Sequence, residues 1–444
     1  MNWNFQKVIW SAVALVITGN AVAAHEAADE KVSPQPPVRS PTTNGVMVEA
    51  LVQEALAKNP ELGFYRAEIA AAKAGRKAAG LWQNPQLSGS VGQKTSRELS
   101  TGMSAEGIAW SVSVAQPFEW PGRIGLRKAI ANREIDLAQL GFERFRAALA
   151  GRVRVLSFGL FAAQEKAAAS REVAERFRAL REVLVQREPA GVTPLLETRV
   201  IEATEVAMQR KASEAEIAKQ AALLELNQLR GAAPGEALVV LAGPMEPGPI
   251  ESSDQLLATA RTNNFELRVR AAELTQQGFK VALAKNERFP AFSVGPSFTE
   301  ENALEQERVV GVVISLALPL WNRNTANIEA AQARQWQAET SLFVAQREVA
   351  RKVLEAAATY EAKRRELGNW RRDAVRQFRE AAELADRHYR LGAVPVATYV
   401  ELQKEYLEAV EAMLDTRKEA LQAGQDLELL TGVVFEPRAS EEKQ

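Results

Sequence analysis

The sequence contains no cysteine and only two histidines, His25 and His388, which lie far apart along the chain. Without cysteine the chain forms no disulfide, thiolate metal site or catalytic thiol, and it carries no N-terminal lipidated cysteine. Two isolated histidines argue against a tight transition-metal site built from imidazoles. We therefore expect no cofactor, no metal ligands and no catalytic residues that depend on metal or thiol chemistry.

An excess of one charge is also lacking, since 55 Lys and Arg balance 56 Asp and Glu. This balance gives no indication of a nucleic-acid partner. The sequence has no Gly-rich phosphate loop, and its scarcity of histidine leaves no catalytic triad, so we expect that the protein is not an enzyme. After the N-terminal region no stretch approaches ~18 uninterrupted apolar residues. If the chain enters a membrane, we expect it to do so as strands.

The N-terminus has the pattern of a secretory signal peptide. Lys7 precedes an apolar run from Val8 to Thr18, and the small residues at Val22 and Ala24 fit cleavage after Ala24. A membrane anchor is the alternative, but the run is too short to span a bilayer core of ~30 Å. Residues 1–24 are therefore predicted to be a signal peptide and residues 25–44 a flexible leader, rich in Ser and Pro toward its end.

The second half of the chain repeats the first with an offset of about 200 residues. The matched stretches are Asn59-Pro60-Glu61-Leu62 with Asn264-Phe265-Glu266-Leu267, Asn84-Pro85 with Phe289-Pro290, Gln116 to Trp120 with Leu318 to Trp321, Gly191 to Pro194 with Gly392 to Pro395, and Leu229-Arg230-Gly231 with Leu430-Thr431-Gly432. We predict repeat 1 over 45–231, a Gly- and Pro-rich linker over 232–253, repeat 2 over 254–432 and a tail over 433–444.

Each copy of the repeat predicts the same series of elements. A helix, about Val46 to Trp82 or about Asp254 to Glu287, precedes two short segments with the period-two alternation of strands. These segments are Leu87 to Val91 and Trp110 to Val114 in the first copy, and Phe292 to Phe298 and Val310 to Leu316 in the second. Next comes a proline-free helical stretch, Gly122 to Arg187 or Asn322 to Arg390, that could reach ~100 Å. After a Gly/Pro turn a shorter helix returns.

The last helix carries two neighbouring apolar seams. One seam is Val396, Val400, Leu407, Val410, Leu414 and Leu421, and the other is Tyr399, Leu402, Tyr406, Ala409 and Met413. Two seams let a helix pack against a neighbour on each side, as a ring of helices requires, although a helix buried in an ordinary bundle has the same pattern. Four strands are too few to close a membrane barrel, so strands in a membrane would have to be shared between chains. Trp120 and Trp321 lie at matching strand-to-helix junctions, where they form an interfacial aromatic belt or pack under their own turns.

This duplicated order of elements resembles the TolC-type outer-membrane efflux ducts over nearly all of the mature chain. The stretches Phe118 to Arg123 and Leu320 to Asn324 are similar to those of the cobalt–zinc–cadmium branch of that family. The resemblance implies a mostly α fold with a small β part and a twofold internal repeat. It further implies a homotrimer, in which four strands per chain contribute to a 12-stranded β-barrel continued by a long α-helical barrel.

The resemblance also implies a function and partners. The protein would sit in outer-membrane lipid, extend into the periplasm and act as the passive exit duct of a tripartite proton-driven efflux system. Its partners would be a periplasmic adaptor and an inner-membrane transporter of the resistance-nodulation-division type. Heavy-metal divalent cations would be the cargo, with small organic toxicants as the alternative. A soluble periplasmic coiled-coil adaptor or scaffold is a further alternative, but it does not explain the matched strands.

The resemblance assigns site residues at the far end of the long helices. The turns that would contact the adaptor are Gly191, Val192 and Thr193 in the first copy and Gly392, Ala393 and Val394 in the second. By position, Glu197 and Tyr389 correspond to a closing pair of the periplasmic gate, and Glu401 corresponds to one of two acidic ring positions. The other ring position is Thr398 here, which departs from the doubled acidic ring of the family. Turn glycines without a partner and solvated helix carboxylates are the alternatives for these residues.

Overall fold

The structure is a computed structural model, and it describes residues 45–97, 102–187, 195–241, 248–303, 305–369 and 374–433. The predicted signal peptide, the leader and the first tip turn lie outside these ranges. In chain order the elements are β1 (Val46–Met47), α1 (Val48–Lys58), α2 (Glu61–Ala79), β2 (Gln86–Arg97), β3 (Ser104–Phe118), α3 (Arg123–Arg187), α4 (Leu195–Arg230), β4 (Val240–Leu241), α5 (Ser253–Asn263), α6 (Phe265–Asn286), β5 (Phe292–Asn302), β6 (Gln306–Leu316), α7 (Thr325–Asn369), α8 (Ala374–Arg390) and α9 (Val396–Thr431).

The first helix of each repeat is divided in two, so the single helices predicted over 46–82 and 254–287 are wrong. In repeat 1, Pro60 disfavours helical geometry at the residue before it, and Asn59 has ψ 124°. In repeat 2, Asn264 has ψ 125° and its side chain accepts from Leu267 N at 3.1 Å, which begins a new helix. Both asparagines therefore end one helix and set the direction of the next.

The same two asparagines fasten each break to the end of the repeat's last helix. Asn59 Nδ2 donates to Leu229 O at 2.8 Å, and Asn264 Nδ2 donates to Leu430 O at 2.7 Å. Each of these helices ends at a glycine with positive φ, Gly231 (68°) and Gly432 (71°). A Cβ on Gly432 would lie 2.6 Å from Asn263 O, so the close approach itself requires glycine. The internal repeat is thus preserved at the level of single hydrogen bonds.

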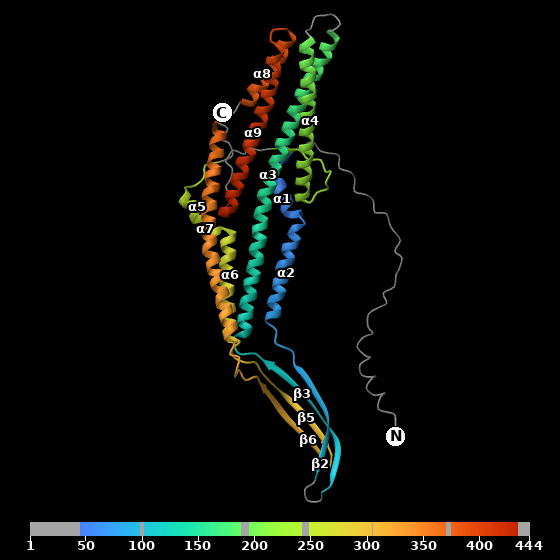
Figure 1. The fold of residues 1–444 in the computed structure, drawn as a ribbon, viewed down its shortest axis with the longest axis vertical. Coiled ribbons are helices and arrows are strands. Elements are labelled where there is room, and N and C mark those ends of the chain that lie inside the picture. The colour runs from blue at the N-terminus through green and yellow to red at the C-terminus, as the bar shows by residue number, and fades with distance from the viewer. Residues whose placement is uncertain are drawn as a thin grey trace, which may run out of the picture. The chain divides into compact units, whose positions relative to one another are not determined.

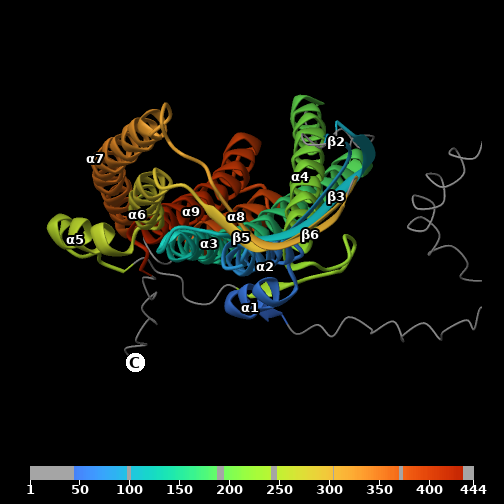
Figure 2. The same ribbon diagram turned by 90° about the horizontal axis from the view of Figure 1, so that it is seen from below.

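Strands from both repeats form one antiparallel sheet of four, in the order β2-β3-β5-β6. The strands contain 12, 15, 11 and 11 residues and extend beyond the short segments that the sequence predicts. In the β3–β5 register, Gly295 and Pro296 of β5 have no paired partner on β3. Pro296 has no N–H to donate, and Gly295 lies directly against Val114 O. Seen from below, the sheet is curved (Figure 2).

The helix α3 is one uninterrupted helix of 65 residues, and it packs against helices of both repeats. The C-terminal half of α3 shares an apolar core with α4, α8 and α9, and both apolar seams of α9 contribute to that core. Nearer its middle it covers α1 and the short parallel pair β1–β4, whose strand β4 lies in the segment predicted as a linker. The sheet lies beyond one end of the helices, and the pairs α3/α4 and α8/α9 reach the other end (Figure 1).

Candidate functional site

The two faces of the four-stranded sheet differ sharply in chemistry. Cross-strand partners lie on the same face, so the register assigns every second residue of each strand to one face. One face is apolar and consists mainly of Leu87, Val91, Ile108, Trp110, Val112, Val114, Phe118, Phe292, Val294, Phe298, Val310, Val312, Ile314 and Leu316. Much of it is exposed in the single chain: Val91 and Val310 are 81% and 80% accessible.

The opposite face is built from small residues. Its members include Ser88, Ser90, Gly92, Ala109, Ser111, Ser113, Ser293, Gly295, Ser297, Thr299, Gly311 and Ser315. Two serine pairs across β2 and β3, Ser88 with Ser113 and Ser90 with Ser111, are hydrogen-bonded at 2.8 Å. A sheet with one apolar and one hydroxyl-rich face is suited to separating an apolar medium from water.

Both edges of this sheet are open within the described chain. The strands β2 and β6 each pair on one side only, so each presents a row of backbone N–H and C=O groups along its outer side. Unpaired edges of this length are avoided in soluble proteins and impossible in lipid. Each edge is therefore a surface on which a further strand could pair.

The two tryptophans at the strand-to-helix junctions, Trp120 and Trp321, differ in their packing and exposure. Trp120 stacks on Phe289 of the other repeat at a centroid distance of 4.8 Å and is 39% exposed, whereas Trp321 is 93% exposed. The alternative that each Trp packs under its own turn is therefore wrong for Trp321, which is almost fully exposed in the single chain. The junction of repeat 1 is fixed by Arg123, whose Nη2 donates to Phe289 O at 2.7 Å and whose Nε donates to Asn286 Oδ1 at 3.1 Å.

At the far end of the helices the structure brings Glu197 and Tyr389 together. Tyr389 Oη donates to Glu197 Oε2 at 3.5 Å, which joins the first turn of α4 to the last turn of α8. The ring of Tyr389 stacks on Tyr399 at 5.2 Å, and Tyr399 is fully buried against Phe177 of α3. Burial, and secondarily the Glu197 carboxylate, raise the pKa of Tyr389, so the phenol is a neutral donor at physiological pH.

Two other predicted site features lie nearby. Gly392 has φ 74° and ends α8 with a left-handed turn, in which its N–H donates to Tyr389 O at 2.9 Å and the Ala393 N–H donates to His388 O at 2.9 Å. Leu391, beside this glycine, is 81% exposed. Glu401 is exposed on α9, on the same helix face as Glu405 and Glu408. The first tip, residues 191–193, lies outside the described residues.

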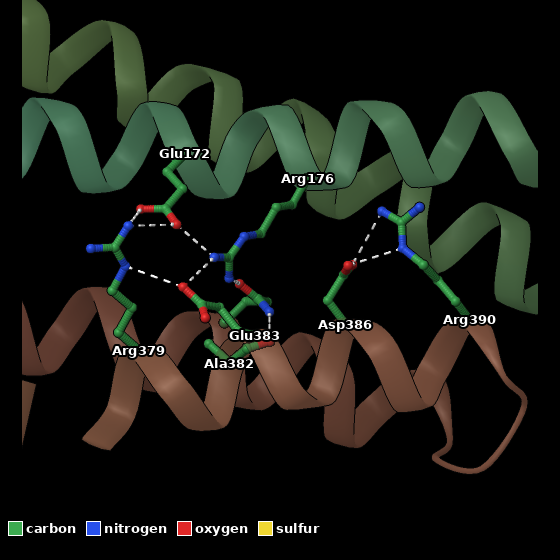
Figure 3. Close-up of polar contacts among 8 residues, drawn as sticks. Glu172, Arg176, Arg379, Ala382, Glu383, Asp386 and Arg390 are labelled. Carbon is green, nitrogen blue, oxygen red and sulfur yellow. Dashed lines mark hydrogen bonds and ion pairs between the residues drawn. The ribbon is translucent and has the colours of Figure 1, made fainter. Parts of the chain in front are cut away.

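A network of charged and polar side chains, which the sequence did not predict, ties α8 and α9 to α3. Arg176 of α3 contacts Glu172 at 2.5 Å, Glu383 of α8 at 3.6 Å and Gln403 Oε1 of α9 at 3.2 Å. Arg379 closes the network with contacts of 3.3 Å to both Glu172 and Glu383 (Figure 3). Gln403 is fully buried, and its Nε2 donates to Ala382 O at 2.7 Å.

Comparison with protein families identifies the chain. Residues 51–232 and 256–433 each match the model of the family described as "Outer membrane efflux protein", so the match covers most of the chain and both repeats. The chain belongs to this family. A comparison with curated proteins found no match.

Solved structures share the fold of this outer membrane efflux protein at low sequence identity. CusC is 15% identical, with a TM-score of 0.67 over 87% of this chain and 92% of that one. A membrane protein from Pseudomonas aeruginosa is 21% identical, with a TM-score of 0.67 over 89% and 92%. The CmeC outer membrane channel of Campylobacter jejuni is 17% identical, with a TM-score of 0.69 over 96% and 95%.

These findings confirm the TolC-type family, the mostly α fold with a twofold internal repeat, and the outer-membrane location with an extension into the periplasm. The protein is an outer membrane efflux channel. None of the helices within the described ranges is long and apolar enough to cross a membrane. In the part of the chain that the structure describes, no group of three or more His, Cys, Asp or Glu side chains is arranged to hold a metal ion.

One signal for the unpredicted network was present in the sequence of this efflux protein. Gln403 occupies the position between Val400 and Leu407 at which the first seam of α9 would continue with an apolar residue. A polar residue inside a helical seam needs a partner when it is buried. The partner, Arg176, lies in the other repeat, and nothing in the local sequence around Gln403 indicates it.

Proposed function

We propose that three copies of this chain form the passive exit duct of a tripartite proton-driven efflux system, together with a periplasmic adaptor and an inner-membrane transporter of the resistance-nodulation-division type. The observation that carries this proposal is a sheet with one apolar face and two open edges. Pairing β6 of one copy with β2 of the next removes every edge and gives a closed barrel of twelve strands. At least about eight strands are needed for membrane barrels.

The dimensions of the apolar face support a membrane position for the sheet. On β3 the apolar residues run from Ile108 to Phe118, which corresponds to about 34 Å along a strand. With the usual strand tilt of about 40°, this length gives a height of about 26 Å, close to the apolar band of outer-membrane barrels. Trp321, Trp120 and Phe289 would then lie at the periplasmic edge of that band, in the aromatic belt.

The mass of the mature protein, extracted from outer membranes in mild detergent and corrected for bound detergent, tests the assembly. We expect a trimer. Val312→Lys places a charge on the apolar face and should cost about 2–4 kcal/mol per copy at the bilayer midplane, so the trimer yield should fall. Val313→Lys, one residue along on the small-residue face, is the matched control and should assemble. A soluble monomer or dimer, or equal yields of the two variants, would contradict the proposal.

The end of the helices opposite the sheet is proposed to be the periplasmic gate. The Tyr389–Glu197 hydrogen bond supports a role in closing it, and Glu401, repeated three times around the axis, would favour cations. The exposed turn at Gly392, Ala393 and Val394, with its counterpart at Gly191, Val192 and Thr193, is proposed to contact the adaptor. Replacing Gly191 and Gly392 with bulky residues should abolish cross-linking to the adaptor while the trimer remains, and normal cross-linking would reject the tip assignment.

We further propose that the cargo is a divalent heavy-metal cation. The support for this is the similarity of Phe118 to Arg123 and Leu320 to Asn324 to the cobalt–zinc–cadmium branch. In a passive duct the choice of cargo rests mainly with the inner-membrane partner. Deletion should sensitise the host to divalent metals, and sensitivity to organic toxicants alone would favour the alternative cargo.

A further inference from the structure

The small-residue face of the sheet carries ionised groups at one level only. Among the residues of β2, β3, β5 and β6 that the register assigns to this face, the charged ones are Lys94, Glu301 and Glu307. All three lie at the end of the sheet farthest from the helices. The other members of this face are Ser, Gly, Ala, Thr and Val, with Gln86 and Pro117 at the helix end.

These three side chains form one connected cluster across the whole sheet. Lys94 Nζ of β2 lies 2.6 Å from Glu301 Oε2 of β5 and 3.1 Å from Glu307 Oε2 of β6. The strand β3 lies between β2 and β5, so the lysine spans two strand spacings, about 9.6 Å. The lysine side chain can cross β3 because the residues of β3 at this level are small: Gly107 is opposite Lys94 and Ala109 is opposite Glu301 in the register.

Gly107 is required for this arrangement. A Cβ at this position would overlap Asn302 O and lie 3.0 Å from Ala303 Cα, so the end of β5 packs directly on the backbone of β3. The neighbouring charges Glu300 and Arg308 pair with each other at 3.4 Å on the opposite, apolar face, where Glu300 lies beside Trp110 in the register. The adjacent residues Glu300 and Glu301 of β5 therefore lie on opposite faces of the sheet, Glu300 on the apolar face and Glu301 on the small-residue face.

We infer that Lys94, Glu301 and Glu307 form the charged ring that sets the ion preference of the outer mouth of the duct, an inference that rests on the proposed trimeric barrel. Each chain contributes two carboxylates and one ammonium, a net charge of −1, and threefold repetition gives −3 around the axis. Apart from Gln86 at the helix end, the side chains at the other levels of this face are short, so these three long side chains would narrow the interior of the proposed barrel at this level. A net negative constriction favours cations over anions.

Reversal potentials of the purified trimer in planar bilayers, under a gradient of dilute KCl, test this inference. The wild-type channel should prefer K⁺ over Cl⁻. Lys94→Met doubles the net charge of the ring and should raise the permeability ratio by about twofold or more, whereas the double variant Glu301→Gln/Glu307→Gln reverses its sign and should lower the ratio by at least as much. Both effects should shrink in 1 M salt, where the screening length falls to about 3 Å.

The matched control is Glu300→Gln, which removes a charge from the adjacent residue on the outer face and should leave the ratio unchanged. The mass of each variant in mild detergent, corrected for bound detergent, shows whether it is a trimer. If the double variant does not assemble, the permeability ratio of Lys94→Met alone tests the inference. A trimeric channel whose ratio does not respond to the ring variants, or responds equally to Glu300→Gln, overturns the inference alone. Absence of trimers and of channel activity in the wild-type protein would instead overturn the proposed function.

Discussion

At the scale of single residues, the Tyr389–Glu197 hydrogen bond links the last turn of α8 directly to the first turn of α4. Tyr389→Phe removes the O–H donor but keeps the ring that stacks on Tyr399. A normal hydrogen bond to a carboxylate contributes about 1.5–3 kcal/mol, and this one is long at 3.5 Å and should contribute less. We therefore expect a folded trimer with a higher single-channel conductance and a modest loss of stability. Conductance in planar bilayers measures the first effect.

The pKa of Tyr389 gives this prediction a pH dependence. Because burial and Glu197 raise its pKa, the stabilisation by the protonated phenol is fully present below the unfolded value of about 10 and is lost as the pH rises through the folded value. Wild type and Tyr389→Phe should therefore differ at pH 7 and converge in strong alkali. Tyr406→Phe, which changes a buried tyrosine of the apolar core on α9, is the control. Equal conductance of wild type and Tyr389→Phe at pH 7 would remove this pair from the gate.

At the scale of secondary-structure elements, the helix break at Asn264 joins α5, α6 and α9. Asn264→Ala removes the N-cap acceptor of α6 and leaves Leu430 O without its side-chain donor, which together should cost about 2 kcal/mol. Denaturant unfolding in detergent, followed by far-UV circular dichroism, should show the loss. Asn263→Ala changes the exposed preceding residue and should be nearly neutral. Similar midpoints for the two variants would show that the break does not depend on this side chain.

Sequence periodicity predicted which elements form but not where they end. The apolar pattern continues through Asn59 and Asn264, and only the first is followed by a proline that indicates a break. The strands were predicted too short because the small residues around Gly92 and Ala109 give weak alternation, and pairing with neighbouring strands extends them. For the site, Glu197 and Tyr389 were paired through their positions in a known family. The Arg176 and Lys94 clusters depend on cross-repeat contacts that no local pattern encodes.

At the scale of the whole molecule, the network around Arg176 joins the two repeats near the proposed gate, beside the apolar core that they share. The network joins α3 of repeat 1 to α8 and α9 of repeat 2 through both buried and exposed contacts. Exposed ion pairs contribute little by themselves, and the Arg379 side chain is 54% exposed. The contact from Arg176, whose side chain is 16% exposed, to the fully buried Gln403 is of a different kind, because a buried amide oxygen without a donor is costly.

Arg176→Met should therefore loosen the attachment of α8 and α9 to α3 without unfolding either repeat. Leaving Gln403 Oε1 without this donor costs about 1–3 kcal/mol, so amide hydrogen exchange in α8 should become at least about five-fold faster, while exchange in α1 should not change. Arg390→Met is the control, because Arg390 pairs with Asp386 inside α8 at 2.9 Å and does not join the repeats through that contact. If both variants accelerate exchange in α8 equally, the effect comes from α8 itself. If only Arg176→Met does so, the two repeats are coupled at this network, and any displacement of α8 and α9 away from α3 must break it.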